Sequence, residues 1–553
     1  MHSAAKTVIF AVLHAALFYA AFAPLNMWAM IFVAPAPLAW LALHARSMRR
    51  AAAVVLVTQV VLWLTVNAWM HDVTTLGHPA LAIYLALYSV LFVWIVRAAA
   101  RHSRFDRVPM SLLLPLVWTG VEALRGDIVF HGYPWFLLAH PAGEAAVFVQ
   151  SADLLGAYLV SFIVAAVAGA IVDLMRWHAG QLPLRRAVAF AMIAVAIQLA
   201  NLAYGAVCLR PPAGATDGPT VLLLQTNLPQ DNKTGWTFEA QVRDLVEFIE
   251  MTRAAHADHP DVDLIVWPET MVPGYGLEED TRATLSSFGL ETRRGMADAV
   301  LGLSRELDTP MLVGAVASRG LTFEPDGEHL RPERDRIYNS AYLIADGAIQ
   351  GRYDKVFLTP FGETMPYISA WPWLEQRLLA LGAAGMSFAL DAAAEPRRLE
   401  LAWSDGTCVL ATPICFEDTV ARVCRDLVYA GGKRADLLVN LSNDGWFGAS
   451  DAGRWHHVQA SRLRCVENRV PMLRCANTGL SVAFDAAGRL TAVAGGTTPA
   501  LRRESVLVAT PRLDQRTTLY GRVGDVWPWI CVVGSLVVPI LTRVDRGSRR
   551  AHG

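Results

Sequence analysis

The apolar residues of this chain form long uninterrupted stretches at its two ends and only short runs between them. A helix needs about 20 mostly apolar residues to cross a bilayer. Seven stretches of roughly this length precede residue 210, and one more follows residue 524. The pattern predicts a multi-pass helical membrane domain at 1-210 and a C-terminal membrane helix at 525-542, with about eight transmembrane helices in all. The predicted segments lie near 5-23, 27-44, 52-70, 79-98, 109-124, 155-175, 187-206 and 525-542.

Residues 215-512 have the pattern of a water-soluble domain instead. LIVW at 264-267 is a short apolar run that ends in turn-forming residues, which is typical of a buried strand. Residues 237-257 and 281-306 carry apolar residues at helical spacing. Asp346-Gly347 separates two strand-like runs and predicts a hairpin turn. Alternating strands and helices indicate a layered α/β domain.

The loops between the predicted membrane segments alternate in charge. Arginines follow the second, fourth, sixth and last segments, whereas loops such as HDVTTLGHP carry almost no Lys or Arg. Basic loops stay in the cytoplasm. The block at 215-512 is therefore expected on the far side of the membrane, which in a bacterium is the periplasm, and 543-553 is expected to be a basic cytoplasmic tail.

AFA at 21-23 also resembles a signal-peptide cleavage site. Cleavage there would leave the block at 215-512 on the same side of the membrane, because the second segment would still run inward.

The loop at 125-153 is outward-facing in this topology and rich in aromatic residues. One interpretation is an aromatic belt at the membrane interface. The other is a wall along which a lipid reaches an active site. The residues alone leave both open.

Composition narrows the function classes. The chain is 54% hydrophobic and 18% charged, and its net charge of -1 does not indicate nucleic-acid binding. No CxxC pair is present, so no zinc or thioredoxin motif is indicated. We interpret His456-His457 as a pair on a helix surface, because no third ligand stands at suitable spacing. No metal and no cofactor is expected.

Three residues of the soluble block are candidates for catalysis. Cys415 follows the apolar run VLATPI, so a turn at the end of a strand would present its thiol outward. Glu269 ends the strand of VWPE and could take and return the thiol proton. Lys355 in YDK could stabilise an oxyanion, and Glu363 eight residues later could hold it in place. Each residue taken alone has an ordinary structural interpretation, as a buried cysteine, a surface glutamate or a solvated lysine.

Together, the three strings resemble the carbon-nitrogen hydrolase, or nitrilase, superfamily, whose triad is Glu, Lys and Cys in this order. Over nearly its full length, the chain resembles the bacterial apolipoprotein N-acyltransferases. The resemblance implies a nitrilase-like αββα sandwich for the soluble block. The strings that carry it are EALR, HGYPW, WPET, YNSAYLI, YDKVFLTPFGE, ICFE, NLSNDGWFG and ANTGLS.

The resemblance implies a reaction in two steps. Cys415 would take a fatty acyl chain from a membrane glycerophospholipid, usually phosphatidylethanolamine, as a thioester. The chain would then pass to the α-amine of the N-terminal diacylglyceryl-cysteine of an apolipoprotein. Glu269 would be the general base, and Lys355 would stabilise the oxyanion with the backbone near Phe416. The protein would be a monomer in the bacterial inner membrane.

Further positions match the family's motifs. Glu363 and Glu417 match residues that support the triad, and Trp236 matches a mobile-arm tryptophan implicated in substrate handling. Asn339 and Trp446 also stand in family motifs and, like Trp236, are expected to bind substrate, with a packing role as the alternative for Trp446. Among the departures from the family pattern, the usual Tyr after the nucleophile is Phe416, and the usual His and Tyr after the lysine are Phe357 and Thr364. The outward loop also has HGYPW where the family usually has TGFPW.

Two other functions are less well supported, although the triad alone does not separate the first of them from acyl transfer. A membrane-tethered amidase or nitrilase would release its product to water, but a hydrolase of that kind needs at most one anchor. A degenerate paralogue that only binds lipoproteins would not need an intact triad. A transporter is not indicated, because charged residues in the predicted membrane segments are few.

Overall fold

The computed structural model describes residues 4–551 apart from 103, 104, 106, 211, 213, 229–235, 328, 372, 378–389 and 431–433, and the side chains of 542–551 are not described. The whole of the predicted tail at 543-553 therefore lies outside the described side chains. The chain forms two compact units. The first comprises Met1–Pro211, Ala449–Glu467 and Thr518–Gly553, and the second comprises Pro212–Gly448 and Asn468–Thr517.

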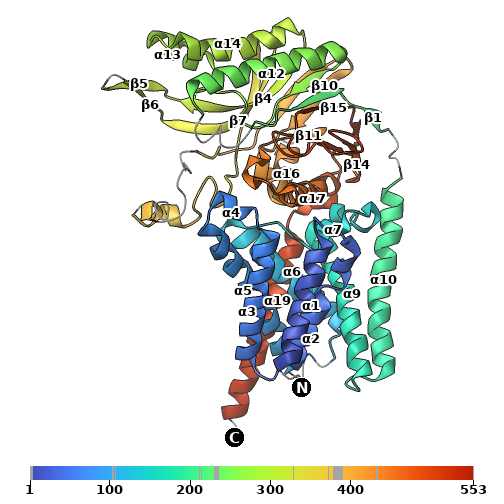
Figure 1. Cartoon of the computed structure of the whole chain (residues 1–553). Coiled ribbons are helices and arrows are strands. Elements are labelled where there is room, and N and C mark those ends of the chain that lie inside the picture. The colour runs from blue at the N-terminus through green and yellow to red at the C-terminus, as the bar shows by residue number, and fades with distance from the viewer. Residues whose placement is uncertain are drawn as a thin grey trace. The chain divides into compact units, whose positions relative to one another are not determined.

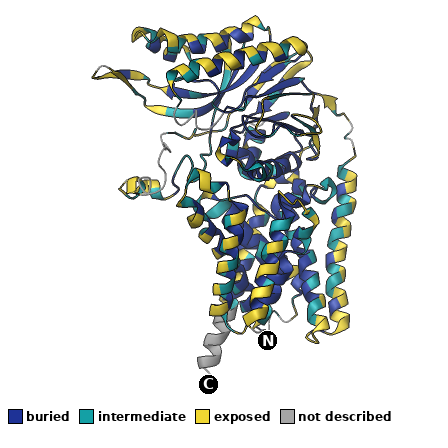
Figure 2. Ribbon diagram, in the orientation of Figure 1, coloured by how far each residue is buried: buried dark blue, intermediate teal, exposed yellow. Residues whose placement is uncertain are grey.

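The first unit is helical, and five of its described helices are long and apolar enough to cross a membrane. Their outward faces expose large apolar side chains such as Val57, Val61 and Leu199, as expected for surfaces that meet lipid (Figure 2). This unit is therefore the membrane part of the protein. The five helices are α1 Ala4–Ala21, α3 Met48–Val66, α5 Gly77–Ala100, α9 Ala157–His178 and α10 Leu184–Cys208.

The remaining predicted segments form shorter apolar stretches of helix, so a count of eight spans is not confirmed. The segment at 27-44 is divided between the short helix η1, Trp28–Phe32, and α2, Pro35–His44. The segment at 109-124 forms α6, Met110–Ala123, whose 14 residues span only about 21 Å at 1.5 Å each. The last segment is the apolar part of α19, Val526–Ala551.

Small residues allow close packing in the helical unit. A Cβ atom added to Gly120 of α6 would lie 2.5 Å from the carbonyl oxygen of Cys531 in α19. The Ser535 hydroxyl of α19 donates a hydrogen bond to the carbonyl of Leu116 at 3.2 Å. Close backbone approach and hydroxyl-to-carbonyl bonds are what hold helices together in lipid, where the hydrophobic effect gives no drive for association.

One helix from the middle of the soluble block belongs to the first unit. This helix, α17, spans Asp451–Asn468, and its residues up to Glu467 pack with the membrane helices (Figure 1). The His456 imidazole lies 2.9 Å from the carbonyl oxygen of Ala23. His456 and His457 are both buried, so their predicted place on a helix surface is wrong. The sequence could not show this, because the covering residues come from the distant N-terminal helices.

The second unit contains two six-stranded sheets packed face to face. The Cys475 thiol of the second sheet contacts the carbonyl oxygens of Leu224 and Val266 in the first, at 3.2 and 3.4 Å. In the first sheet, with the order β15-β2-β3-β4-β7-β8, strands β2 to β4 are parallel. In the second, with the order β14-β13-β12-β11-β10-β9, β10 to β12 are parallel. The strands are β2 Val221–Gln225, β3 Leu264–Val266, β4 Met311–Arg319, β7 Arg336–Ala345, β8 Ala348–Asp354, β9 Leu399–Trp403, β10 Gly406–Ala411, β11 Leu437–Ser442, β12 Met472–Ala476, β13 Val482–Phe484, β14 Leu490–Val493 and β15 Ser505–Ala509.

Helices cover the outer faces of this sandwich (Figure 1). The helix predicted at 237-257 is α12, Phe238–Asp258, and the helix predicted at 281-306 is divided into α13, Glu279–Ser287, and α14, Glu291–Glu306. The division follows from Gly289, whose φ of +70° no helix interior allows. On the second sheet lies α16, Ala421–Tyr429. The layered α/β architecture and the hairpin turn between β7 and β8 are confirmed.

Candidate active site

Cys415 occupies a strained turn just after strand β10. Its φ is +51°, a conformation that residues other than glycine rarely adopt. The Asn440 amide of β11 donates hydrogen bonds to the carbonyls of Pro413 and Cys415, at 3.0 and 3.3 Å. The turn continues into a short helix, Cys415–Thr419. This geometry presents a side chain at the end of a sheet, as a nucleophile requires.

Glu269 lies three residues beyond the end of β3 and is only 7% exposed. The Asn339 side-chain amide donates to its Oε1 at 2.7 Å, and the Asn443 backbone N–H donates to its Oε2 at 2.8 Å. Two donors that hold both oxygens fix the plane of the carboxylate.

Lys355 follows β8 directly and is fully buried. Its Nζ donates to Glu363 Oε2 at 2.6 Å, and the Thr359 N–H donates to the same oxygen at 2.7 Å. Burial alone would lower the pKa of Lys355, but the charges of Glu363, Glu269 and Cys415 raise it above its ordinary value. The ammonium is therefore retained in a site that excludes water, where a positive charge acts most strongly.

Asn339 of β7 joins the glutamate to the lysine. Its side-chain amide donates to Glu269. Its backbone carbonyl oxygen accepts a hydrogen bond from the backbone N–H of Lys355 at 2.9 Å. The thiol of Cys415 lies within the electrostatic reach of both groups. Burial and the Glu269 charge raise its pKa well above the ordinary value, and Lys355 opposes them. The three predicted residues therefore meet at one place, at the carboxyl ends of strands from both sheets.

Glu417 ties the nucleophile turn to the lysine loop. It is fully buried, and its Oε1 accepts the backbone N–H groups of Val356 and Phe357, both at 2.9 Å. Its Oε2 accepts the Ile414 N–H at 2.7 Å, and the Tyr353 hydroxyl donates to both oxygens. Burial raises the pKa of Glu417 to about 7, against the lowering effect of Lys355. This carboxyl sets the distance between the turn of Cys415 and the start of the lysine loop.

The other predicted residues have different surroundings. The Phe416 ring stacks on Phe357 with centroids 6.3 Å apart, so two departures from the family pattern pack on each other. Trp236 donates to Asp244 at 2.7 Å and packs against the core of the first sheet. Trp446 is 39% exposed. Among the described contacts, neither tryptophan touches the triad.

Several buried residues of the site were not singled out from the sequence. Asn443 holds Glu269 through its backbone, and the Asn477 amide donates to the Asn443 side chain at 2.9 Å. The Arg474 guanidinium donates to Asp444 at 2.7 Å and to Ser442 at 3.1 Å. These residues lie in or beside the strings NLSNDGWFG and ANTGLS. Those strings were the available signal, but neither reveals which side chain reaches which partner.

The raised pKa of Cys415 predicts how the thiol reacts with alkylating agents. An upward shift of this pKa leaves the thiol almost entirely protonated at neutral pH. The rate at which iodoacetamide labels Cys415, followed by mass spectrometry, should still be rising at about pH 9. In Glu269→Gln the profile should shift to lower pH, because the carboxylate that raises the pKa is gone. A rate that levels off below about pH 7 would contradict this prediction.

Asn339→Leu should impair turnover by releasing one oxygen of Glu269. A hydrogen bond to a charged group contributes about 1.5–3 kcal/mol, so kcat/KM should fall roughly 10- to 100-fold. Gln350→Leu is a matched control, because it removes amide bonds to the carbonyls of Ala345 and Ala348. Unchanged kinetics in Asn339→Leu would show that the amide does not position Glu269.

Comparison with known proteins gives consistent matches. Residues 14–170 match the family described as apolipoprotein N-acyltransferase N-terminal domain, and residues 223–517 match the family described as carbon-nitrogen hydrolase. The apolipoprotein N-acyltransferase of Geobacter metallireducens is 32% identical over 474 residues, which are 86% of this chain and 81% of that protein. That of Methylococcus capsulatus is 30% identical over 471 residues, 85% of this chain and 81% of that protein. A solved amidase from Nesterenkonia sp. has a TM-score of 0.34 and 16% identity, covering 54% of this chain and 93% of that one.

Proposed function

The chain belongs to the apolipoprotein N-acyltransferases, enzymes built on a carbon-nitrogen hydrolase domain, and we propose that it works through a thioester on Cys415. The observation that carries this proposal is the meeting of Glu269, Lys355 and Cys415 at one edge of the sandwich. A base, a fixed ammonium and a thiol are sufficient for acyl transfer without a cofactor.

In the first step, Glu269 takes the thiol proton as the sulfur of Cys415 attacks an ester carbonyl carbon. A C–S bond forms, and the negative charge moves to the carbonyl oxygen. The Lys355 ammonium and the backbone N–H of Phe416 stabilise this oxyanion. The ester C–O bond then breaks, and Glu269 returns its proton to the oxygen of the leaving lysophospholipid. A fatty acyl thioester remains on Cys415.

In the second step, the α-amine of the acceptor attacks the thioester. Glu269 accepts a proton from the amine, and Lys355 again stabilises the oxyanion. The C–S bond breaks, the amide bond forms, and the sulfur recovers its proton from Glu269. The mature lipoprotein departs. Because the raised pKa of Cys415 favours the protonated thiol, the attack in the first step depends on Glu269 as base.

The remaining residues act around this centre. Glu363 holds the ammonium of Lys355, and Glu417 holds the turn of Cys415, as their hydrogen bonds support. Trp236 and Trp446 contact substrate. Trp236 would have to leave Asp244 to do so, which agrees with the role that the family resemblance gives it.

The substrates of this family are membrane lipids and lipoproteins, and five apolar helices place the chain in a membrane. The acyl donor is a glycerophospholipid, phosphatidylethanolamine above all, and the acceptor is a diacylglyceryl-apolipoprotein. The chain crosses the bacterial inner membrane with about eight helices as a monomer, and its catalytic unit faces the periplasm. The alternation of basic loops supports this orientation.

Intact mass spectrometry of the detergent-purified protein tests the mechanism. Incubation with phosphatidylethanolamine should add one fatty acyl mass, which maps to Cys415 and is removed by hydroxylamine. A diacylglyceryl-cysteine peptide should then discharge the adduct and gain the acyl chain. Discharge by water alone would favour a hydrolase. Absence of an adduct on a thiol that still reacts with iodoacetamide would disprove the donor.

A further inference from the structure

Arg474 is a fully buried arginine of the catalytic unit whose partners come from the active-site loops. Its Nη2 donates to Asp444 Oδ1 at 2.7 Å and to Ser442 Oγ at 3.1 Å, and its Nη1 donates to the Leu480 carbonyl at 3.0 Å. Its Nε lies 3.5 Å from Asp418 Oδ2. Taking two charges out of water costs about as much as their attraction returns, so a buried ion pair is weak evidence for stability. The partners of Arg474 therefore point to another purpose.

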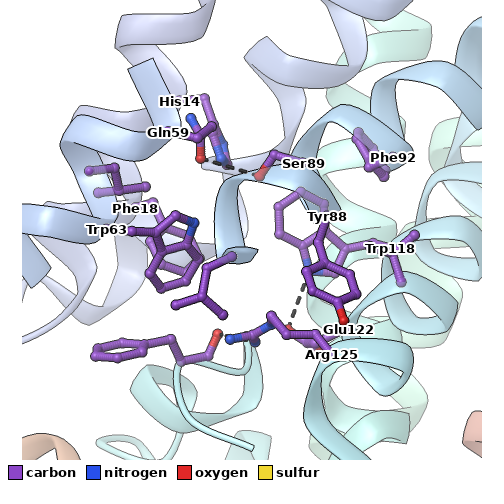
Figure 3. A pocket seen from close by; sticks show the side chains of 14 residues that line it. His14, Phe18, Gln59, Trp63, Tyr88, Ser89, Phe92, Trp118, Glu122 and Arg125 are labelled. Atoms are coloured by element: carbon purple, nitrogen blue, oxygen red, sulfur yellow. Dashed lines mark hydrogen bonds between the residues drawn. The ribbon is translucent and has the colours of Figure 1, made fainter. Parts of the chain in front are cut away.

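The buried Arg125 of the helical unit shows a purely structural use of such a side chain. Together with Glu122 it lines a small cavity among α1, α3, α5 and α6 (Figure 3). Its guanidinium donates to the backbone carbonyls of Trp135 and Phe136, at 2.7 and 3.1 Å. Those contacts shape one loop of the helical unit. Arg474 differs, because its partners are side chains that stand next to parts of the catalytic site.

Asp444 and Asp418 each stand beside a part of the catalytic machinery. Asp444 directly follows Asn443, whose backbone N–H donates to Glu269 Oε2 at 2.8 Å. Asp418 lies in the short helix that begins with the nucleophile. Both carboxylates are buried. The guanidinium of Arg474 thus joins the loop that holds the base to the helix that carries the thiol.

The second sheet places Arg474 where it can make this connection. Strands β11 and β12 are parallel, and Arg474 pairs in register with Asn440. Side chains of register partners leave the same face of a sheet. The Asn440 amide donates to the Cys415 carbonyl at 3.3 Å. Two neighbours on one face of the sheet therefore hold the nucleophile turn, one through its backbone and one through Asp418.

The charge of Arg474 also reaches the thiol. Burial alone would lower the pKa of Arg474, but the charges of Asp444, Asp418 and a Cys415 thiolate raise it. The guanidinium therefore stays charged, and because the attraction is mutual it favours the thiolate. The other charged groups that act on the pKa of this thiol are Glu269, Lys355, Asp444 and Glu363.

We propose that Arg474 is a positioning residue of the reaction, which holds the nucleophile helix Cys415–Thr419 at a fixed distance from the loop that anchors Glu269. Its planar fork contacts both carboxylates at once, which the single nitrogen of a lysine could not do. Its charge also offsets that of Asp444, which opposes a thiolate nearby. The inference rests on the proposed function, because it takes Cys415 as the nucleophile and Glu269 as the base.

Arg474→Lys tests the connection, because it keeps the charge but offers one nitrogen. Single-turnover acylation by phosphatidylethanolamine should slow about 10- to 100-fold at saturation, while the half-saturating lipid concentration stays close to that of the wild type. Arg489→Lys is the matched control, because the exposed Arg489 pairs with Asp485 at 2.6 Å on the surface of the same unit, and it should react like the wild type. An unchanged rate in Arg474→Lys, or weaker lipid binding alone, would overturn the positioning role.

Alkylation of the thiol tests the charge without any lipid. In Arg474→Gln the rate at which iodoacetamide labels Cys415 should begin to rise at higher pH than in the wild type, because Asp444 has lost its counter-charge and raises the pKa of the thiol further. Adding Asp444→Asn should move the profile back to lower pH. If Arg474→Gln does not fold, Asp418→Asn removes one end of the connection and should slow single-turnover acylation about 10-fold.

These measurements separate the inference from the proposed function. If the wild-type protein forms no adduct with the lipid but the labelling profile of Arg474→Gln still shifts, the thioester mechanism fails and the action of Arg474 on the thiol is supported. If the wild-type adduct forms and folded Arg474→Lys and Arg474→Gln both behave like the wild type, the mechanism stands and the inference is wrong.

Discussion

Cys415→Ala is expected to abolish acyl transfer and to leave the protein folded. Without the sulfur no thioester can form, and removal of a nucleophile of this kind lowers turnover by about 10⁴-fold or more. The side chain is partly exposed at the edge of the sandwich, so loss of one atom leaves little cavity. The cost in stability should be about 1 kcal/mol or less. Transfer of a labelled acyl chain to a diacylglyceryl-cysteine peptide measures the first effect, and thermal unfolding measures the second.

Cys408→Ala is the matched control for this experiment. Cys408 is also a free thiol, lies in β10 seven residues earlier and is buried, and its raised pKa of about 12 makes it unreactive. Its replacement should cost more stability than that of Cys415, because it opens a space in the core, yet transfer should continue. Transfer by well-folded Cys415→Ala protein would sink the thioester mechanism.

Lys355→Met is expected to affect both turnover and stability. Loss of an oxyanion donor in a buried site lowers the rate by about 10²- to 10³-fold. The change also leaves the Glu363 carboxylate without its ion-pair partner at 2.6 Å. Breaking a buried pair by removing one partner costs about 3–5 kcal/mol. Lys355→Met should therefore unfold at a clearly lower temperature and be almost inactive.

The double variant Lys355→Met/Glu363→Gln separates these two effects. With the isolated carboxylate neutralised, most of the lost stability should return, because no buried charge remains unpaired. Activity should not return, since the ammonium is still absent. A double variant that regains both would mean that Lys355 is needed only to neutralise Glu363. Thermal unfolding and single-turnover acylation on the same samples decide between the two.

How much of the site the sequence predicts depends on how far apart along the chain the interacting residues lie. Glu269, Lys355 and Cys415 could be selected because each ends a strand within a distinctive string, which is local information. Their common location then followed from the family resemblance. The contacts that hold them could not be predicted in this way, although Asn339 itself was singled out from its motif. Asn339 and Asn443 reach Glu269 from 70 and 174 residues away.

The structure also gives Glu417 a more specific task than the motif did. From ICFE it could be assigned only a supporting role. Its hydrogen bonds to the N–H groups of Val356 and Phe357 show that it joins two loops from different sheets. Such a contact depends on how the sheets face each other, and no spacing along the chain encodes that.

The sequence by itself predicted apolar membrane helices, the α/β character of the block at 215-512 and the three candidate catalytic residues. Each depends on periodicity or on residue types within a few positions. Only the tertiary structure decided that α17 packs with the membrane helices, that His456 is buried and that Glu122 faces a cavity. These properties arise from side chains that distant segments bring together. Burial and hydrogen-bond partners are therefore set by packing rather than by local pattern.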